Sequence, residues 1–199
     1  MGRRSDHSRE EIRQLALGAA EAIVAEGGFK ALTARKVAAA IGYTVGTLYL
    51  VFENLDDLVF QLNGRTLDQL YQRMLDEKHH SYSGKKALYA LATAYIDYAE
   101  AESPRWNMLL EYVAGKDEVM PDWYLEKLGQ VFGLVEETLA STVGNQDDKT
   151  ISQAARVLWA SVHGICILKI RQRLDLAGGQ STGEMACMLI DNFVEGMSR

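Results

Sequence analysis

The stretch from Thr33 to Leu58 constrains the fold more than any other part of this 199-residue chain. Thr33 is a good N-cap for a short helix, because its hydroxyl can accept a hydrogen bond from a free backbone N–H. Gly42 then ends that helix, since glycine takes positive φ at little cost. Thr44 offers a second N-cap, for a helix of barely two turns from Val45 to Phe52. Two short helices joined by a tight glycine turn predict a helix-turn-helix, whose second helix fits the major groove of DNA.

The rest of the chain indicates an all-α protein. It has only two prolines, Pro104 and Pro121, and no stretch shows sustained alternation of apolar and polar residues. Capping residues and glycine breaks predict the other helices. We expect these helices at residues 8–27, 54–80, 85–101, 103–113, 121–141, 149–174 and from 181 to near the C-terminus. The first of them is predicted to bury Ile12, Leu15, Ala19 and Ile23.

The charge is unevenly distributed along the chain. Residues 1–52 hold seven Lys or Arg and five Asp or Glu, a net charge of +2, whereas the remainder holds 14 against 22, a net of −8. The positive end contains the helix-turn-helix, which supports nucleic-acid binding weakly. We therefore expect a DNA-binding domain at residues 1–53 and a second helical-bundle domain at residues 54–199.

Residues 42–52 resemble the DNA-binding region of the tetracycline-repressor (TetR) family of bacterial transcription regulators. Gly42-Tyr43-Thr44, Gly46-Thr47-Leu48-Tyr49 and Phe52 stand in the order that the family uses. The chain departs from the family at Val51, where His or Tyr is common, and at Leu55, where Lys is common. The resemblance implies that such a lysine touches a DNA phosphate, so this contact is in doubt here.

The residues expected at the DNA lie on both short helices. Threonines at the start of the second helix can hydrogen-bond to bases or pack a methyl group on thymine, although Thr44 can also serve as a cap alone. The first helix can bind phosphate through its free N–H groups, and the resemblance suggests a phosphate contact for the Tyr49 hydroxyl. Arg3 and Arg4 belong either to a backbone-following arm or to a free tail. The predicted DNA-binding residues are Thr33, Arg35, Lys36, Gly42, Tyr43, Thr44, Val45, Thr47 and Tyr49.

A second site is expected in the body of the chain, because a one-component regulator needs an effector pocket. The resemblance implies that it lies between the fourth and the eighth helix. Its aromatic residues suit an apolar or flat organic effector, although aromatic residues at helical spacing are more often simply core. Trp159 and His163-Gly164 are similar to the Trp/His-Gly (WHG) signature of one C-terminal subgroup of the family, with a structural histidine as the alternative. The predicted effector-binding residues are Tyr95, Tyr98, Trp106, Tyr112, Trp123, Trp159 and His163.

The last two helices are expected to join two copies of the chain. The run from Val157 to Leu168 contains no charge and is apolar nearly all round, so it should not face water. Two such hairpins would pack as a four-helix bundle, and a two-fold operator needs a two-fold protein. The alternative is that both helices form the core of a monomer, but the family resemblance implies the dimer.

Other classes of protein have less support. The chain has no phosphate-cradling glycine motif, nucleophile elbow or HExxH, so we expect neither an enzyme nor a cofactor. His79 and His80 beside Asp76 and Glu77 fit a solvated helix end better than a metal site. The N-terminus is polar, the two cysteines are expected to be reduced, and the longest uncharged apolar run has 12 residues. A membrane span needs about 20. We therefore expect a cytoplasmic protein without membrane contact.

We therefore expect a ligand-responsive DNA-binding transcriptional regulator that acts as a repressor. The alternative is a helical small-molecule-binding or partner-binding protein without DNA regulation, and a metal-assisted enzyme ranks third.

Overall fold

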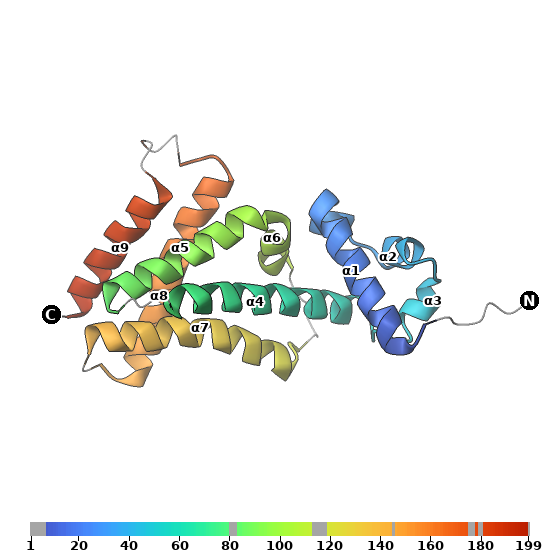
Figure 1. The fold of residues 1–199 in the computed structure, drawn as a ribbon, viewed down its shortest axis with the longest axis horizontal. Coiled ribbons are helices and arrows are strands. Elements are labelled where there is room, and N and C mark those ends of the chain that lie inside the picture. Colours follow the sequence, from blue (N-terminus) through green and yellow to red (C-terminus); the bar gives the residue numbers. More distant parts are fainter. Residues whose placement is uncertain are drawn as a thin grey trace, which may run out of the picture. The chain divides into compact units, whose positions relative to one another are not determined.

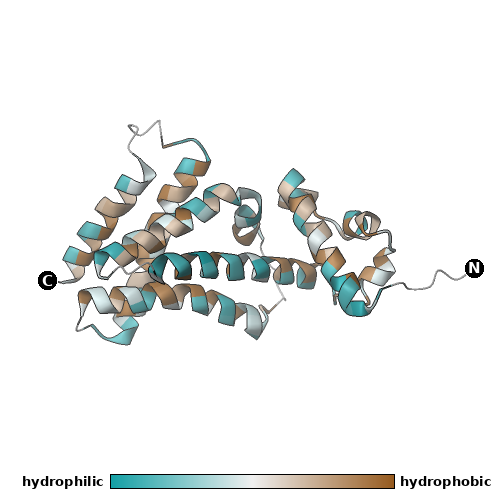
Figure 2. Cartoon of the chain, viewed as in Figure 1, coloured by the Kyte–Doolittle hydropathy of each residue, from teal (hydrophilic) through white to brown (hydrophobic). Residues whose placement is uncertain are grey.

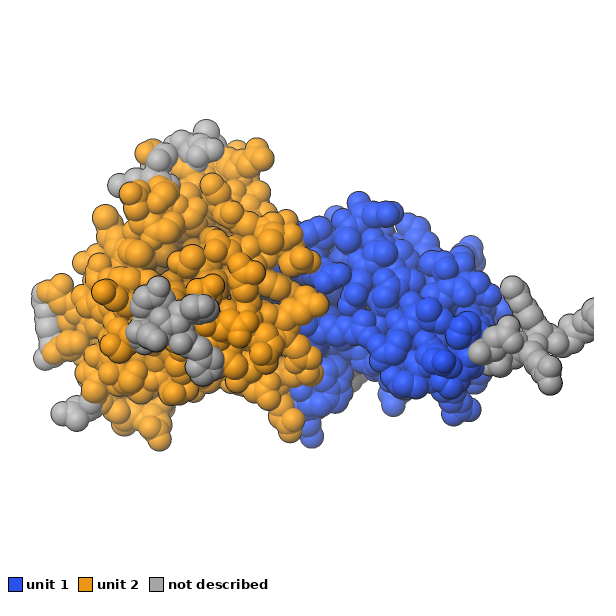
Figure 3. Space-filling view, in the orientation of Figure 1, with its two compact units in different colours: residues 1–66, 104–124 blue, residues 67–103, 125–199 orange. Residues whose placement is uncertain are grey.

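The computed structural model describes residues 7–79, 83–112, 119–144, 146–174, 178 and 181–198, and these confirm the predicted all-helical fold (Figure 1). The helices are α1 (Arg9–Gly27), the 3-10 helix η1 (Phe29–Ala31), α2 (Ala34–Ala40), α3 (Val45–Leu48), α4 (Leu55–His79), α5 (Lys85–Ala101), α6 (Ser103–Glu111), α7 (Asp122–Val143), α8 (Asp148–Ile170) and α9 (Thr182–Met197). The chain divides into two compact units (Figure 3). The first unit comprises residues 1–66 and 104–124, and the second comprises residues 67–103 and 125–199.

Five predicted helix starts are confirmed by their capping bonds. Ser8 and Ser181 each form a complete capping box with the glutamate three residues later. The hydroxyls of Thr33 and Thr44 accept hydrogen bonds from the backbone three residues on, and the Asn54 side chain accepts one from the N–H of Asp57. These bonds satisfy N–H groups that have no partner inside the helix, which is why short polar residues at these positions set where the helices begin.

The core of the first unit lies where α1 packs against η1, α2 and α3. The predicted buried face of α1 was partly wrong: Ile12 is buried, but Leu15 is 42% exposed, and Ala19 and Ile23 are only half-buried. The core contains Ile12 together with Ala16, Leu17, Ala20 and Val24, and Ile23 packs against its edge. The predicted stripe is rotated around the helix axis relative to the buried one, because helical spacing alone does not fix which side the neighbouring helices cover.

Two helices end earlier than the sequence predicts. α3 stops at Leu48, and tight turns continue to Phe52, with the N–H groups of Val51 and Phe52 both donating to the carbonyl of Leu48. α8 stops at Ile170 instead of Leu174, because Gln172 takes φ of 52°, which a right-handed helix does not permit.

The start of α6 differs from the prediction as well. Ser103 is its first helical residue and not its cap, and its hydroxyl donates to the carbonyl of Glu100.

Helix α4 contributes residues to both compact units. Leu58 and Leu62 belong to the core of the first unit, whereas Leu70 and Met74 are buried in the second, so all four predicted core positions of this helix are confirmed. Figure 2 shows hydrophilic residues along much of α4 outside these positions. The predicted boundary after residue 53 separates a DNA-binding domain from an effector-binding domain. The two compact units are defined by packing and do not test it, so it stays a prediction.

In the second unit, α5 packs against α8 and α9, and α8 packs against α9. The expectation that α8 cannot face water is wrong for the single chain. Val157 is 56% exposed and Leu168 is 42% exposed, and Ala160 and Gly164 between them are exposed too. We call these four residues the α8 stripe. By length and composition alone, α8 is also the one helix in the described part of the chain that could cross a membrane, a weak indication because core helices of soluble proteins share these properties.

Some predicted features lie outside the described residues. They are Arg3, Arg4, His80, the segment 113–118 and Gly179.

Candidate functional site

The helix-turn-helix is built by the turn between α2 and α3. Gly42 has φ of +74°, a conformation that side chains with a Cβ rarely adopt, and the N–H of Tyr43 returns to the carbonyl of Ala38 to close the turn. Leu48, Val51 and Phe52 are buried beneath the turn. The two short helices are therefore fixed from below by an apolar core and joined by a turn that glycine permits.

The start of α3 presents two threonine hydroxyls to solvent. The Thr44 hydroxyl accepts the N–H of Thr47 at 3.2 Å, and the two hydroxyl oxygens lie 3.0 Å apart. Thr44 is exposed and Thr47 half-exposed. The capping function of Thr44 is thus confirmed. A hydroxyl has two acceptor lone pairs and one proton, so capping leaves Thr44 able to make a further contact.

The other predicted DNA-binding residues lie in the same compact unit. Arg35 and Lys36 are exposed in the first turn of α2, where Thr33 caps the helix. Tyr49, immediately after α3, is 44% exposed, whereas Val45 is half-buried. The structure therefore brings the predicted residues together at the two short helices, and their contacts with DNA stay predictions.

His7 is a neighbour of this surface that the sequence reading missed. Its Nδ1 lies 2.8 Å from the hydroxyl of Tyr43, and the two rings meet edge to face. This contact connects the segment just before α1 with the helix-turn-helix, although the two residues are 36 positions apart in the sequence. Nothing in the sequence signals this contact, because it depends on how α1 and the turn pack.

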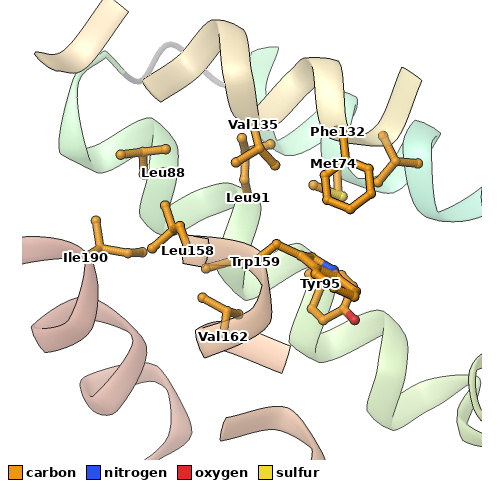
Figure 4. Close-up of a pocket in the computed structure, with 12 residues that line it drawn as sticks. Met74, Leu88, Leu91, Tyr95, Phe132, Val135, Leu158, Trp159, Val162 and Ile190 are labelled. Atoms are coloured by element: carbon orange, nitrogen blue, oxygen red, sulfur yellow. The ribbon is translucent and has the colours of Figure 1, made fainter. Parts of the chain in front are cut away.

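The second unit contains an apolar cavity of about 40 Å³ (Figure 4). Residues from α4, α5, α7, α8 and α9 line it, and almost no polar atom faces it. The lining residues are Met74, Leu88, Leu91, Ala92, Tyr95, Val131, Phe132, Val135, Leu158, Trp159, Val162 and Ile190.

Only two of the predicted effector-binding residues, Tyr95 and Trp159, line this cavity. The Tyr98 side chain is buried and donates its hydroxyl to Gln69. The other predicted aromatics, Trp106, Tyr112 and Trp123, belong to the first unit and are not among the lining residues. The sequence reading favoured aromatic residues and so missed the aliphatic majority of the lining, together with Met74 and Phe132. In the sequence, residues that line a cavity have the same helical spacing as residues that fill a solid core, so the two cannot be distinguished.

His163 lies behind the cavity wall and holds its two aromatic residues. Its Nδ1 is 2.7 Å from the Tyr95 hydroxyl, and its ring stacks on Trp159 with the ring centroids 5.1 Å apart. Partial burial of the imidazole lowers its pKa below the ordinary 6.5. His163 is therefore neutral at pH 7 and serves as a hydrogen-bonding spacer between Tyr95 and Trp159.

This lowered pKa predicts that acid destabilises the fold through His163. The unfolded chain binds the proton more tightly than the native one, so the contribution is complete above pH 6.5 and is lost as pH falls below 6.5 toward the native pKa. Urea unfolding at pH 7.5 and 5.5 should show a larger loss of stability in the wild type than in His163→Gln. Equal losses in wild type and His163→Gln would contradict the prediction.

Metal and thiol chemistry have little basis in this structure. Within the described residues, no group of three His, Cys, Asp or Glu side chains could hold a metal ion. Both cysteines are free thiols. Burial and the nearby Glu100 carboxylate raise the pKa of Cys166 to about 12, and burial also raises the pKa of Cys187. Neither sulfur is therefore activated as a nucleophile.

Comparison with solved structures finds the same fold in bacterial proteins of low sequence identity. A protein of unknown function from Rhodococcus sp. RHA1 is 21% identical, with a TM-score of 0.78 and all of both chains covered. SCO4454, a TetR-family transcriptional regulator from Streptomyces coelicolor, is 20% identical, with a TM-score of 0.70 and 96% and 97% of the two chains covered. The regulator FadR from Bacillus subtilis in complex with stearoyl-CoA is 15% identical, with a TM-score of 0.66 and 92% and 98% covered. No curated protein matches the chain.

Family comparison covers both ends of the chain. Residues 16–62 match the bacterial regulatory proteins of the tetR family, and residues 88–193 match the tetracyclin repressor-like C-terminal domain. The first match contains the helix-turn-helix, and the second, which alone covers more than half of the chain, contains most of the cavity lining. The WHG subgroup suggested by Trp159 and His163-Gly164 stays a prediction. The chain belongs to the TetR family of transcriptional regulators.

Proposed function

We propose that this regulator represses transcription by binding a palindromic operator as a homodimer, and that a small apolar or aromatic effector releases it. The single observation that carries the DNA-binding part is the exposed start of α3, held by the Gly42 turn and a buried Leu48. The family supports the regulatory part. No enzymatic activity enters this proposal, and its place of action is the cytoplasm, where the operator is.

Specific and non-specific contacts are assigned to different side chains of the proposed DNA surface. Thr44 and Thr47 lie at the N-terminal end of α3, the end of a recognition helix that usually reaches base edges. Thr33, Arg35, Lys36 and the Tyr49 hydroxyl are assigned to phosphates, which position the protein without reading sequence. Affinity should therefore fall steeply with salt, because each phosphate contact releases counterions.

Substitutions at Thr47 and Tyr49 should separate these two kinds of contact. Thr47→Val keeps a methyl group for thymine but removes the hydroxyl, and Thr47→Ser does the reverse. We expect both to relax the preference at one operator position, by about 1–3 kcal/mol between best and mismatched bases. Tyr49→Phe should weaken all DNA sequences alike. Selection from a random DNA pool, followed by titration of the best site at several salt concentrations, measures both effects.

Failure of that selection would decide against DNA regulation. If the purified wild-type dimer enriches no sequence, the alternative function gains: a helical small-molecule-binding or partner-binding protein. If Thr47→Ser and Thr47→Val both retain the full wild-type preference, the residues assigned to base reading are wrong although the protein binds DNA.

The proposed homodimer forms through the last two helices. The α8 stripe leaves apolar surface in water in the single chain, and Met188 on the neighbouring α9 is 57% exposed. A second copy of the same hairpin would cover these residues in a two-fold, self-complementary contact. Such a dimer would also supply the two recognition helices that a palindromic site requires.

The proposed effector site is the cavity of the second unit. Its apolar lining fits the general character of small-molecule sites, and FadR, a structural neighbour, is described in complex with stearoyl-CoA. An effector releases DNA only if it binds the DNA-free conformation more tightly than the DNA-bound one. A compound that stabilises the protein in a thermal scan but leaves operator affinity unchanged at saturation would not be the effector.

A further inference from the structure

We infer that the cavity of the second unit takes an uncharged hydrocarbon group and selects it by size, without recognising any polar function. This inference rests on the proposed effector role of the cavity. Its first support is the lining itself. Among the twelve lining residues, only Tyr95 and Trp159 carry a polar atom, and almost no polar atom faces the interior.

The one hydroxyl in the wall is already engaged. The Tyr95 hydroxyl is 2.7 Å from Nδ1 of His163, which is outside the lining. Figure 4 shows the oxygen directed away from Leu88 and Val135, on the far side of its ring. A ligand hydroxyl or amide placed in the cavity would lose its hydrogen bonds to water and find no partner, which is unfavourable.

The arginine that contacts this wall is paired with a glutamate. The Arg156 guanidinium lies 5.2 Å from the centre of the Phe132 ring, and its Nη1 is 2.8 Å from the Glu136 carboxylate. The same Glu136 oxygen accepts a hydrogen bond from Ser152. Because the glutamate already neutralises the arginine, this pair offers no free cation for the carboxylate or phosphate of an anionic ligand.

The unliganded cavity is too small for its proposed occupant. An engineered apolar cavity of about 150 Å³ binds benzene, whereas this one measures about 40 Å³. Binding must therefore displace part of the wall. Phe132 and Trp159 are half-buried and meet edge to face with centroids 5.4 Å apart, and Met74 is an unbranched side chain that adapts its shape. We expect these three side chains to yield first, since a change of side-chain rotamer does not require a helix to move.

Calorimetric titration of the full-length wild type tests the chemistry with three probes of one skeleton: butylbenzene, 4-butylphenol and 4-butylbenzoate. We expect the hydrocarbon to bind about ten-fold more tightly than the phenol and at least a hundred-fold more tightly than the carboxylate. Equal or tighter binding of 4-butylbenzoate would overturn the inference. Absence of binding by all three probes would overturn it as well.

Cavity variants locate the binding. Ala92→Leu fills the cavity and should weaken butylbenzene at least ten-fold, whereas Ala90→Leu, on the same helix but outside the lining, should not. Should the filled variant not fold, Val135→Ala enlarges the cavity and should shift the preference from butylbenzene toward hexylbenzene. Val194→Ala is its control, since Val194 is a buried valine of the same unit that does not line the cavity, whereas Val135 is half-buried in its wall. Identical preferences in both valine variants would contradict the assignment.

Operator release is measured separately, so that the two proposals can fail independently. If butylbenzene binds in the cavity but does not weaken operator binding, the inferred chemistry stands and the effector role fails. If an anionic compound releases DNA and competes with butylbenzene for the cavity, the effector role stands and the inferred chemistry is wrong.

Discussion

Arginine in place of Gly164 is expected to leave the chain folded and to abolish operator binding. Gly164 is exposed in the middle of the α8 stripe, and a Cβ added there meets no atom within 4 Å. Arginine is also a better helix former than glycine, by up to about 1 kcal/mol. In the proposed dimer, however, the long charged side chain would be buried without a partner, which is strongly unfavourable. Operator affinity should fall on the order of a thousand-fold, toward that of non-specific binding.

The control is a glycine of the same kind on another face of the second unit. Gly129 is an exposed residue within α7, and a Cβ there also meets no atom within 4 Å. Gly129→Arg should remain dimeric and bind the operator as the wild type does. Sedimentation at micromolar concentration, with DNA titration of both variants, gives the answer. A Gly164→Arg protein that stays dimeric, or a wild type that is monomeric, rules out the α8 stripe as the interface.

Alanine in place of Leu48 should produce the second large effect, a collapse of the helix-turn-helix. Leu48 is 1% exposed at the end of α3 and belongs to the core shared with α1 and α2. Truncating a buried leucine typically costs about 2–5 kcal/mol, because the transfer energy is lost and a cavity remains. Since α3 is only four residues long, it has little stability apart from this packing. DNA binding should be lost together with the local fold.

Leu50, two residues further on, is the matched control. It is 64% exposed, so Leu50→Ala should change stability by no more than about 0.5 kcal/mol. Hydrogen exchange of the α2 and α3 amides, together with urea unfolding of the full chain, compares the two variants. If Leu48→Ala protects these amides as well as Leu50→Ala does, the apolar support of the turn is not what holds α3 in place.

Features that depend on a few neighbouring residues were predictable. The caps at Ser8, Thr33, Thr44 and Asn54 are each satisfied within three residues, so their chemistry is complete in the local sequence. The same holds for the Gly42 turn, because a positive φ favours glycine whatever the surrounding fold. The order of residues from Gly42 to Phe52 was sufficient to identify the family.

Features that depend on packing were predictable only in part. The buried face of α1 was misjudged because helical spacing permits both Leu15 with Ala19 and Ala16 with Ala20, and only the helices packed against α1 decide between them. The end of α8 was placed four residues late, since the apolar pattern continues past the backbone break at Gln172. For the buried face of α1 and for the end of α8, the apolar pattern was compatible with two different placements.

The sequence by itself determined the helical class, most of the helix starts and the DNA-reading motif, because local hydrogen bonds and helical periodicity specify them. The tertiary structure alone decided which aromatic residues meet. It brought Tyr95 and Trp159 to one cavity, bound both to His163, and assigned Trp106, Tyr112 and Trp123 to the other compact unit. It also decided which side of α8 remains in water. The physical reason is that a cavity wall, a solid core and an uncovered face draw on the same apolar residues at the same spacing, and only the positions of the neighbouring helices distinguish them.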